Sequence, residues 1–225
     1  WRDQIGFFKD IFDVVAVDIP GFGKSGHLKA YDSIHDISAN LLNFLTKLGV
    51  DAFHLVGHSM GGMIVQQMAL DAPERIAKLV LYGTGPLGVR PGRFETIEES
   101  SRRIETEGYA QTASRIAATW FVKGNEAEGY PLCKELGQMG SADAAQRSLT
   151  AWENWSVEDQ LSEINCPTLI VWGEEDQSYD KAQPQSLKDG IPNSKFVAVP
   201  NCAHNVHMEA PEVFNDLVDD FLKGS

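Results

Sequence analysis

Residues 57–62 read GHSMGG and place Ser59 among glycines, directly after the short apolar run FHLV. A G-x-S-x-G sequence between a strand and a helix predicts a strained turn that exposes the serine hydroxyl, with the small Gly57 and Gly61 letting the chain pass. The N–H of Met60, at the start of the helix, would point to where negative charge forms on a tetrahedral intermediate. This segment therefore predicts nucleophilic attack by Ser59 on a carbonyl carbon. A glycine-rich turn capped by a serine is the structural alternative.

A serine hydroxyl is a weak nucleophile until a base removes its proton, and that base needs an acid to fix its tautomer. Candidates for both follow later apolar runs. Glu174, Glu175 and Asp176 come after PTLIVW, and His204 comes soon after KFVAV. The chain order serine, acid, histidine would bring all three groups to one edge of a sheet. From the residues alone the acid stays open, because Asp180 also lies near enough to compete.

The elements that would position these groups alternate between strand and helix. Short, apolar, β-branched runs predict strands at 13–18, 53–56, 79–82, 167–172 and 195–199. Helical periodicity predicts helices at 34–48, 63–70 and 211–222, the first with Ser33 as N-cap and Gly49 as its stop. This order indicates a mostly parallel sheet flanked by helices that cross over between the strands.

The strand pattern stops in the middle of the chain. Between about residues 85 and 158, β-branched runs are few and four helices are expected, near Phe94–Glu107, Tyr109–Phe121, Glu126–Met139 and Ser141–Trp155. We therefore expect an α/β core formed by residues 1–84 and 159–225, interrupted by a helical insertion at 85–158.

Residues 18–26, DIPGFGKSG, contain a G-x-G-x-x-G and a GKS that raise the question of nucleotide binding. A dinucleotide site needs a helix that opens at the glycines, whereas the periodic segment here starts only at residue 34. A P-loop ending at Ser25 would need glycine at position 18, which is Asp18. We therefore interpret the glycines as a turn that uses positive φ.

The composition narrows the possible partners. A net charge of −13 leaves no basic stripe for nucleic acid or for an anionic membrane surface. No apolar run approaches the ~18 residues of a membrane span, and the first residues do not resemble a signal peptide. Three scattered cysteines, Cys133, Cys166 and Cys202, form neither a disulfide framework nor a metal cluster, which fits a reducing cytoplasm.

Four segments together, GHSMGG, WGEED, NCAHNVHMEAPEVF and DIPGFGKS, resemble the α/β-hydrolase family. The similarity is to its capped branch of small esterases, lactonases and carbon–carbon hydrolases. It covers nearly the whole chain outside the insertion. The resemblance implies that Asp176, third after Gly173, is the acid. It also implies that His204 is the base, because Glu209, Pro211 and Phe214 follow at the family's usual spacing.

The family resemblance also implies a function. We expect a serine hydrolase that cleaves a small ester through an acyl-enzyme under a helical cap, without a metal or an organic cofactor. A carbon–carbon hydrolase of vinylogous diketones and an enol-lactonase are the close alternatives, because they share the triad. A ligand receptor on the same fold is a further one. Substrate identity and oligomeric state are left open by the sequence.

The family begins with strands and a His-Gly turn that supplies the second oxyanion-hole N–H, and no such segment precedes Trp1. Residues 1–5, WRDQI, instead resemble the helix that follows this turn. We therefore expect an internal fragment of a longer chain. The alternative is a chain that lacks the strand between residues 13–18 and 53–56, which would leave unpaired strand edges about 9–10 Å apart.

Other residues with chemical potential receive lesser roles. His207 could pair with His204 at a metal, but no third ligand is evident, and His58 is interpreted as packing support behind the turn. Lys24, Arg102, Arg103 and Arg115 are expected to be solvated, although one of the arginines could meet a substrate carboxylate. Aromatic residues of the insertion should form its core, with a few lining the substrate pocket; the candidates are Trp120, Phe121 and Trp152.

Overall fold

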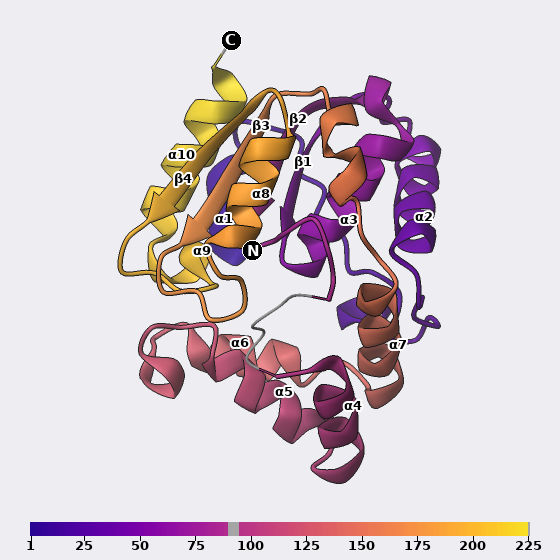
Figure 1. Ribbon diagram of the computed structural model, residues 1–225, viewed down its shortest axis with the longest axis vertical. Helices are drawn as coiled ribbons and strands as arrows, with labels where there is room; N and C mark the ends of the chain where they lie inside the picture. Colours follow the sequence, from indigo (N-terminus) through magenta and orange to yellow (C-terminus); the bar gives the residue numbers. More distant parts are fainter. Residues whose placement is uncertain (90–94, 225) are drawn as a thin grey trace.

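Four parallel strands form the centre of the molecule (Figure 1). The computed structural model describes residues 1–89 and 95–224. The strands lie in the order β1-β2-β3-β4 and are β1 (Phe53–His58), β2 (Ile76–Tyr82), β3 (Thr168–Gly173) and β4 (Ser194–Val199). Because all three pairings are parallel, the four strands end at the same edge of the sheet. These strands confirm four of the five predicted from the sequence.

Alternate residues of the strands pack on opposite faces of the sheet. Leu79 and Leu81 belong to a core shared with α2 (Ile34–Lys47), α3 (Met60–Asp71) and α8 (Ala182–Gly190). Val80 and Tyr82 belong to a second core, shared with α1 (Arg2–Phe8) and α10 (Pro211–Lys223). All four side chains are fully buried, which explains why residues 79–82 of β2 are a continuous apolar run rather than an alternating one.

The core also contains a short helix, several 3₁₀ turns lie along the chain, and the predicted cap of α2 is present. α9 (Val206–Glu209) precedes α10, and 3₁₀ turns lie at Gly23–Ser25, Pro73–Arg75, Gly124–Glu126 and Glu158–Glu163. The Ser33 hydroxyl caps α2 by accepting from the N–H of Asp36, and Gly49 ends this helix region at a φ of 73°. No helix in the described ranges combines the length and apolar character needed to cross a bilayer.

Four helices lie between β2 and β3 in the chain. They gather beyond the edge of the sheet at which the strands end (Figure 1) and are α4 (Ile97–Thr106), α5 (Tyr109–Ala118), α6 (Tyr130–Gly137) and α7 (Ala142–Glu153). Each falls within a segment predicted to be helical. The predicted start of the first, Phe94, lies outside the described residues, and α4 begins after Thr96, which caps it by accepting from Glu99 N–H.

The prediction of a strand at residues 13–18 is wrong. The segment has no regular structure, and its three valines, Val14, Val15 and Val17, are 41–47% exposed. β-Branched residues favour a strand only where a neighbouring strand accepts their backbone hydrogen bonds. Among the described residues, none forms such a neighbour for this segment, and β1 is the end strand of the sheet on its own side.

Candidate active site

Ser59 occupies a strained turn between β1 and α3. Its φ of 54° and ψ of −119° lie where residues with a side chain are rarely found, at a cost of about 1–3 kcal/mol. Residues at and just after the end of β2 hold this conformation. Ser59 N–H donates to the carbonyl of Tyr82 at 3.0 Å, and Thr84 Oγ1 donates to the carbonyl of Ser59 at 2.9 Å.

Two glycines allow the turn to form, although only one of them is among the pair that the sequence motif predicts. A Cβ at Gly57 would lie 2.4 Å from the carbonyl oxygen of Gly61, and one at Gly62 would lie 2.5 Å from the Thr84 side chain. A Cβ at Gly61 would meet no atom outside its own helix and chain neighbours within 4 Å. The close approach after the serine therefore falls at Gly62, where the helix packs on Thr84, and not at Gly61.

Met60 is the first residue of α3. Its backbone N–H has no acceptor within the helix, because the first N–H groups of any helix lack one. The positive end of the helix dipole therefore lies beside the Ser59 hydroxyl. This arrangement suits an oxyanion better than a neutral group.

His204 and Asp176 form a buried pair. Nδ1 of His204 lies 2.8 Å from Oδ2 of Asp176, and the two side chains are 1% and 0% exposed. The other oxygen of Asp176 accepts the N–H groups of Ser178 and Tyr179 at 2.7 and 3.1 Å. The carboxylate fixes the proton on Nδ1, so that Nε2 of the imidazole is the acceptor.

The competing carboxylates lie elsewhere. Glu174 and Glu175 are exposed on the loop after β3. Asp180 is also exposed, and it accepts the N–H of Ala182 at the start of α8. Of the acids weighed from the sequence, the structure brings Asp176 to the histidine.

The turn of Ser59 and the ring of His204 both lie next to the end of β2. The backbone of Ser59 bonds to Tyr82 and Thr84, and a Cβ on the residue between them, Gly83, would lie 3.1 Å from Nδ1 of His204. Within the described part of the chain, the hydroxyl of Ser59 and the imidazole make no hydrogen bond. Bonds between a nucleophile and its base commonly tighten only in the complex with substrate.

Aromatic rings surround the imidazole. The rings of Tyr179 and His204 are stacked, with centroids 5.7 Å apart and planes 9° apart, and the Trp120 ring lies 5.8 Å away. Phe121 is buried in the insertion at 2% exposure, and Trp152 packs against the core that contains α2 and α3. Of the three predicted pocket residues, Trp120 is the one whose ring contacts His204.

The backbone carbonyl of His204 accepts two hydrogen bonds from behind the site, at 2.6 Å from Tyr82 O–H and at 3.0 Å from Nε2 of His58. Because the single proton of Tyr82 is used here, its oxygen must accept from Nδ1–H of His207 at 3.1 Å. Burial lowers the pKa of His58 well below its usual range and that of His207 to about 3, and it raises the pKa of Tyr82. All three groups are therefore neutral near pH 7.

These contacts correct the sequence interpretation of His58 and identify the partner of His207. His58 does more than pack behind the turn, because it holds the backbone of His204, and its ring centroid lies 4.3 Å from that of His204. His207 contacts Tyr82 rather than a metal, and within the described residues no group of three His, Cys, Asp or Glu side chains could hold one. Tyr82 was missed, although a tyrosine that ends an otherwise apolar buried strand signals a hydrogen-bonded hydroxyl.

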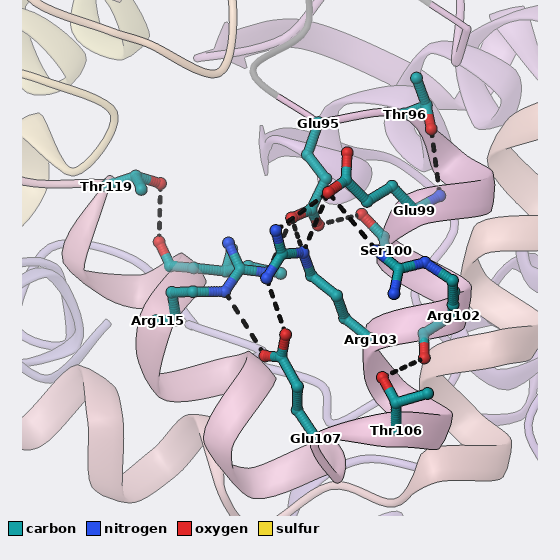
Figure 2. Close-up of polar contacts among 11 residues, drawn as sticks. Glu95, Thr96, Glu99, Ser100, Arg102, Arg103, Thr106, Glu107, Arg115 and Thr119 are labelled. Carbon is teal, nitrogen blue, oxygen red and sulfur yellow. Dashed lines mark hydrogen bonds and ion pairs between the residues drawn. The ribbon is translucent and has the colours of Figure 1, made fainter.

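Arg103 and Arg115 of the insertion are paired and not simply solvated (Figure 2). The buried carboxylate of Glu95 lies 3.1 Å from Nε of Arg103 and 2.7 Å from Nη2 of Arg115. Glu99 and Glu107 each lie one helical turn from Arg103, at 2.9 and 2.7 Å. Arg102 is 62% exposed, as expected. With their charge already matched, Arg103 and Arg115 have less capacity for a substrate carboxylate than the sequence suggested.

A parallel sheet with a serine turn at its carboxyl edge, followed by a buried Asp–His pair, defines the hydrolases of the α/β fold. A sequence model of the alpha/beta hydrolase family matches residues 1–217. The chain therefore belongs to the alpha/beta hydrolase family.

Similar proteins include a dienedioate hydrolase and enol-lactonases. The chain is 30% identical over 233 residues to a 2-hydroxy-6-oxononadienedioate/2-hydroxy-6-oxononatrienedioate hydrolase of Paraburkholderia phymatum, covering 99% of this chain and 80% of that one. It is 25% identical to 3-oxoadipate enol-lactonase 2 of Acinetobacter baylyi, covering 99% and 83%. The crystal structure of an enol-lactonase from Burkholderia xenovorans has the same fold, with a TM-score of 0.90 at 20% identity over 99% of this chain and 85% of that one.

Proposed function

We propose that this hydrolase uses Ser59 as nucleophile, His204 as general base and then acid, and Asp176 to orient the imidazole. The observation that carries the proposal is the buried 2.8 Å contact between Asp176 and His204, which leaves Nε2 of the imidazole as the acceptor for the Ser59 proton. The N–H of Met60 would stabilise the oxyanion. No other described serine combines a strained turn with a neighbouring imidazole–carboxylate pair.

The reaction would proceed in two halves. In the first, Ser59 Oγ attacks the carbonyl carbon while His204 takes the hydroxyl proton, and the oxyanion forms beside Met60 N–H. The intermediate collapses, and His204 returns the proton to the leaving carbon or oxygen. In the second half, water loses a proton to His204 and attacks the acyl group on Ser59, which releases a carboxylic acid and regenerates the serine.

For the bond that is cleaved, we propose the carbon–carbon bond of a vinylogous diketone, with an enol-lactone as the second candidate. The expectation from sequence placed a small ester first. The named relatives support the reverse order, because the one at 30% identity hydrolyses a dienedioate and the one at 25% an enol-lactone. An enol-lactone is itself an ester, so the second candidate retains the chemistry first expected.

We further propose that residues 85–158 act as a cap over this site, on a core of residues 1–84 and 159–225. The position of α4 to α7 beyond the edge where the strands end supports it (Figure 1), as does the contact of Trp120 with His204. A small molecule enclosed between cap and core would be shielded from water. The net charge of −13 argues against nucleic acid as partner, and the free cysteines suit a reducing compartment, for which we propose the cytoplasm.

A panel of three substrates tests the proposal: a 2-hydroxy-6-oxodienedioate, an enol-lactone and p-nitrophenyl acetate. We expect the highest kcat/KM for the dienedioate and multiple turnovers for all three. A higher kcat/KM for p-nitrophenyl acetate would indicate that simple esters are the substrate class. A single burst without turnover, with a raised melting temperature, would instead indicate a ligand receptor.

A fluorophosphonate probe tests the nucleophile independently of the substrate. Such probes react with a serine only when a neighbouring base activates it. We expect one mass increment, on the peptide that contains Ser59. Labelling of any other residue would reject the catalytic scheme.

A further inference from the structure

We propose that Glu209 is a positioning residue that fastens the helical insertion to the loop of His204, so that the insertion and the imidazole keep a fixed relation. The inference rests on the proposed function. One oxygen of the Glu209 carboxylate accepts the N–H of Val122 at 2.8 Å, just beyond α5. The other accepts the N–H of Ala203, the neighbour of His204, at 2.7 Å. A single carboxylate thus joins two segments that lie 81 positions apart in the chain (203 minus 122).

A second set of contacts joins the same two segments. The N–H of Asn205 donates to the carbonyl of Trp120 at 3.0 Å, and the Asn205 amide contacts Sγ of Cys133 on α6 at 3.8 Å. Bonds therefore reach the insertion from the residues on both sides of His204. The loop of the proposed base cannot shift without breaking contacts to the insertion.

The joined segment also carries an aromatic ring beside the imidazole. The Trp120 and His204 rings lie 5.8 Å apart, and Trp120 is two residues from the N–H that Glu209 holds. A displacement of residues 120–122 would move the indole and, through Glu209 and Asn205, the histidine loop. The same attachment therefore fixes the positions of both the Trp120 ring and the His204 loop.

The insertion is braced internally, so that the attachment holds more than a loose loop. Arg115 on α5 bonds to the carboxylate of Glu95, which also holds Arg103 and Ser100 on α4 (Figure 2). The α4–α5 pair is therefore fixed by ion pairs in the last turn of α5, and the segment just beyond the same end is held by Glu209. The last turn of α5 thus couples the position of α4 to the active site.

The chemistry of the two partners requires a carboxylate. Both are backbone N–H donors, so both oxygens of residue 209 must accept. A glutamine has the same shape but offers one acceptor oxygen, and its NH₂ group would face an N–H donor. Glu209→Gln therefore releases one of the two segments with little change in volume.

The test compares Glu209→Gln with the wild type and with Glu212→Gln, a matched control on the exposed first turn of α10. The first measurement is the rate at which diisopropyl fluorophosphate labels Ser59, because this small probe needs the imidazole but not a fitted pocket. The second is kcat and KM for the best substrate of the panel. Melting temperature and circular dichroism verify that each variant is folded at the assay temperature.

We expect Glu209→Gln to label about ten- to a hundred-fold more slowly and to lose kcat by a similar factor, because small displacements of catalytic groups have effects of this size. A folded variant that labels at the wild-type rate overturns the proposal, even if its melting temperature falls, because that result means a structural role only. If Glu209→Gln does not fold, Glu209→Asp, which keeps the charge but is one methylene too short to reach both donors, is judged by the same rates. A wild type that is not labelled at Ser59 refutes the proposed function instead.

Discussion

Nδ1 of His204 lies 2.8 Å from Oδ2 of Asp176, and neither side chain is more than 1% exposed. The second oxygen of the carboxylate is occupied by two backbone N–H groups of its own loop. Asp176 therefore cannot rotate away from the imidazole without leaving buried donors unsatisfied. Asp176 therefore holds the His204 imidazole in the tautomer that carries its proton on Nδ1.

Asp176→Asn should reduce kcat by about 10⁴-fold, because the amide would favour the wrong tautomer of the imidazole. The shape of the loop should survive, since the asparagine oxygen can still accept from the backbone. Steady-state kinetics on the substrate panel measures the loss, with Glu175→Gln on the exposed face of the same loop as control. If the control loses the activity and Asp176→Asn keeps it, the acid is misassigned.

Ser59→Ala should abolish hydrolysis and leave the melting temperature nearly unchanged, because alanine keeps the strained φ of 54°. Ser59→Gly should be equally inactive but more stable than Ser59→Ala, since glycine relieves a strain of about 1–3 kcal/mol against an entropic cost of about 0.5–1 kcal/mol. Thermal unfolding of both variants checks the order. Retained activity in either would show that another group is the nucleophile.

The sequence was sufficient for features whose cause is local. The four sheet strands, the cap of α2 and the turn at Ser59 follow from residues close together in the chain. The segment 13–18 has the same local pattern but is not a strand, because strand formation also depends on a neighbour that no local pattern reports.

Contacts across the fold were the part that the sequence did not reveal. His58 and Tyr82 reach the carbonyl of His204 over separations of 146 and 122 residues, and no periodicity marks such a contact. Arg103 is different, because Glu99 and Glu107 lie four residues away on either side. That spacing is the usual signal of helix ion pairs and could have been used.

The stability of the protein should fall in acid partly through His207. Its pKa is lowered from 6.5 to about 3, mainly by burial, so between these values the unfolded chain binds a proton that the folded protein does not. This difference in proton binding has no effect on stability above pH 6.5. As the pH falls below that value, it lowers the free energy of unfolding by about 1.4 kcal/mol per pH unit.

His207→Gln removes this titration. The difference in free energy of unfolding between the wild type and this less stable variant should therefore shrink by about 2 kcal/mol between pH 7 and pH 5. Urea unfolding at several pH values measures the difference, with His35→Gln on the exposed face of α2 as control. Parallel stability curves for wild type and His207→Gln would contradict the prediction.

Glu95→Gln should lower the melting temperature by several degrees. The buried carboxylate accepts from Arg115 at 2.7 Å and from Ser100 at 2.5 Å, and charged hydrogen bonds contribute about 1.5–3 kcal/mol each. Glu98→Gln, exposed on the first turn of α4, removes the same charge without these contacts and should change the midpoint little. Equal effects of the two changes would mean that the network in Figure 2 does not stabilise the insertion.

Gly83→Ala should reduce activity by more than its loss of stability explains. Gly83 has a φ of 51°, and a Cβ there would lie 3.1 Å from Nδ1 and 3.2 Å from Cε1 of His204. The methyl group would push the imidazole away from Asp176, and a shift of this kind can cost about 10²-fold in turnover. Gly49→Ala is the matched control, because Gly49 has a φ of 73° with no atom within 4 Å of the added Cβ. Both variants should lose similar stability, while only Gly83→Ala should lose activity; equal activities would show that the imidazole has more room than the contact distances indicate.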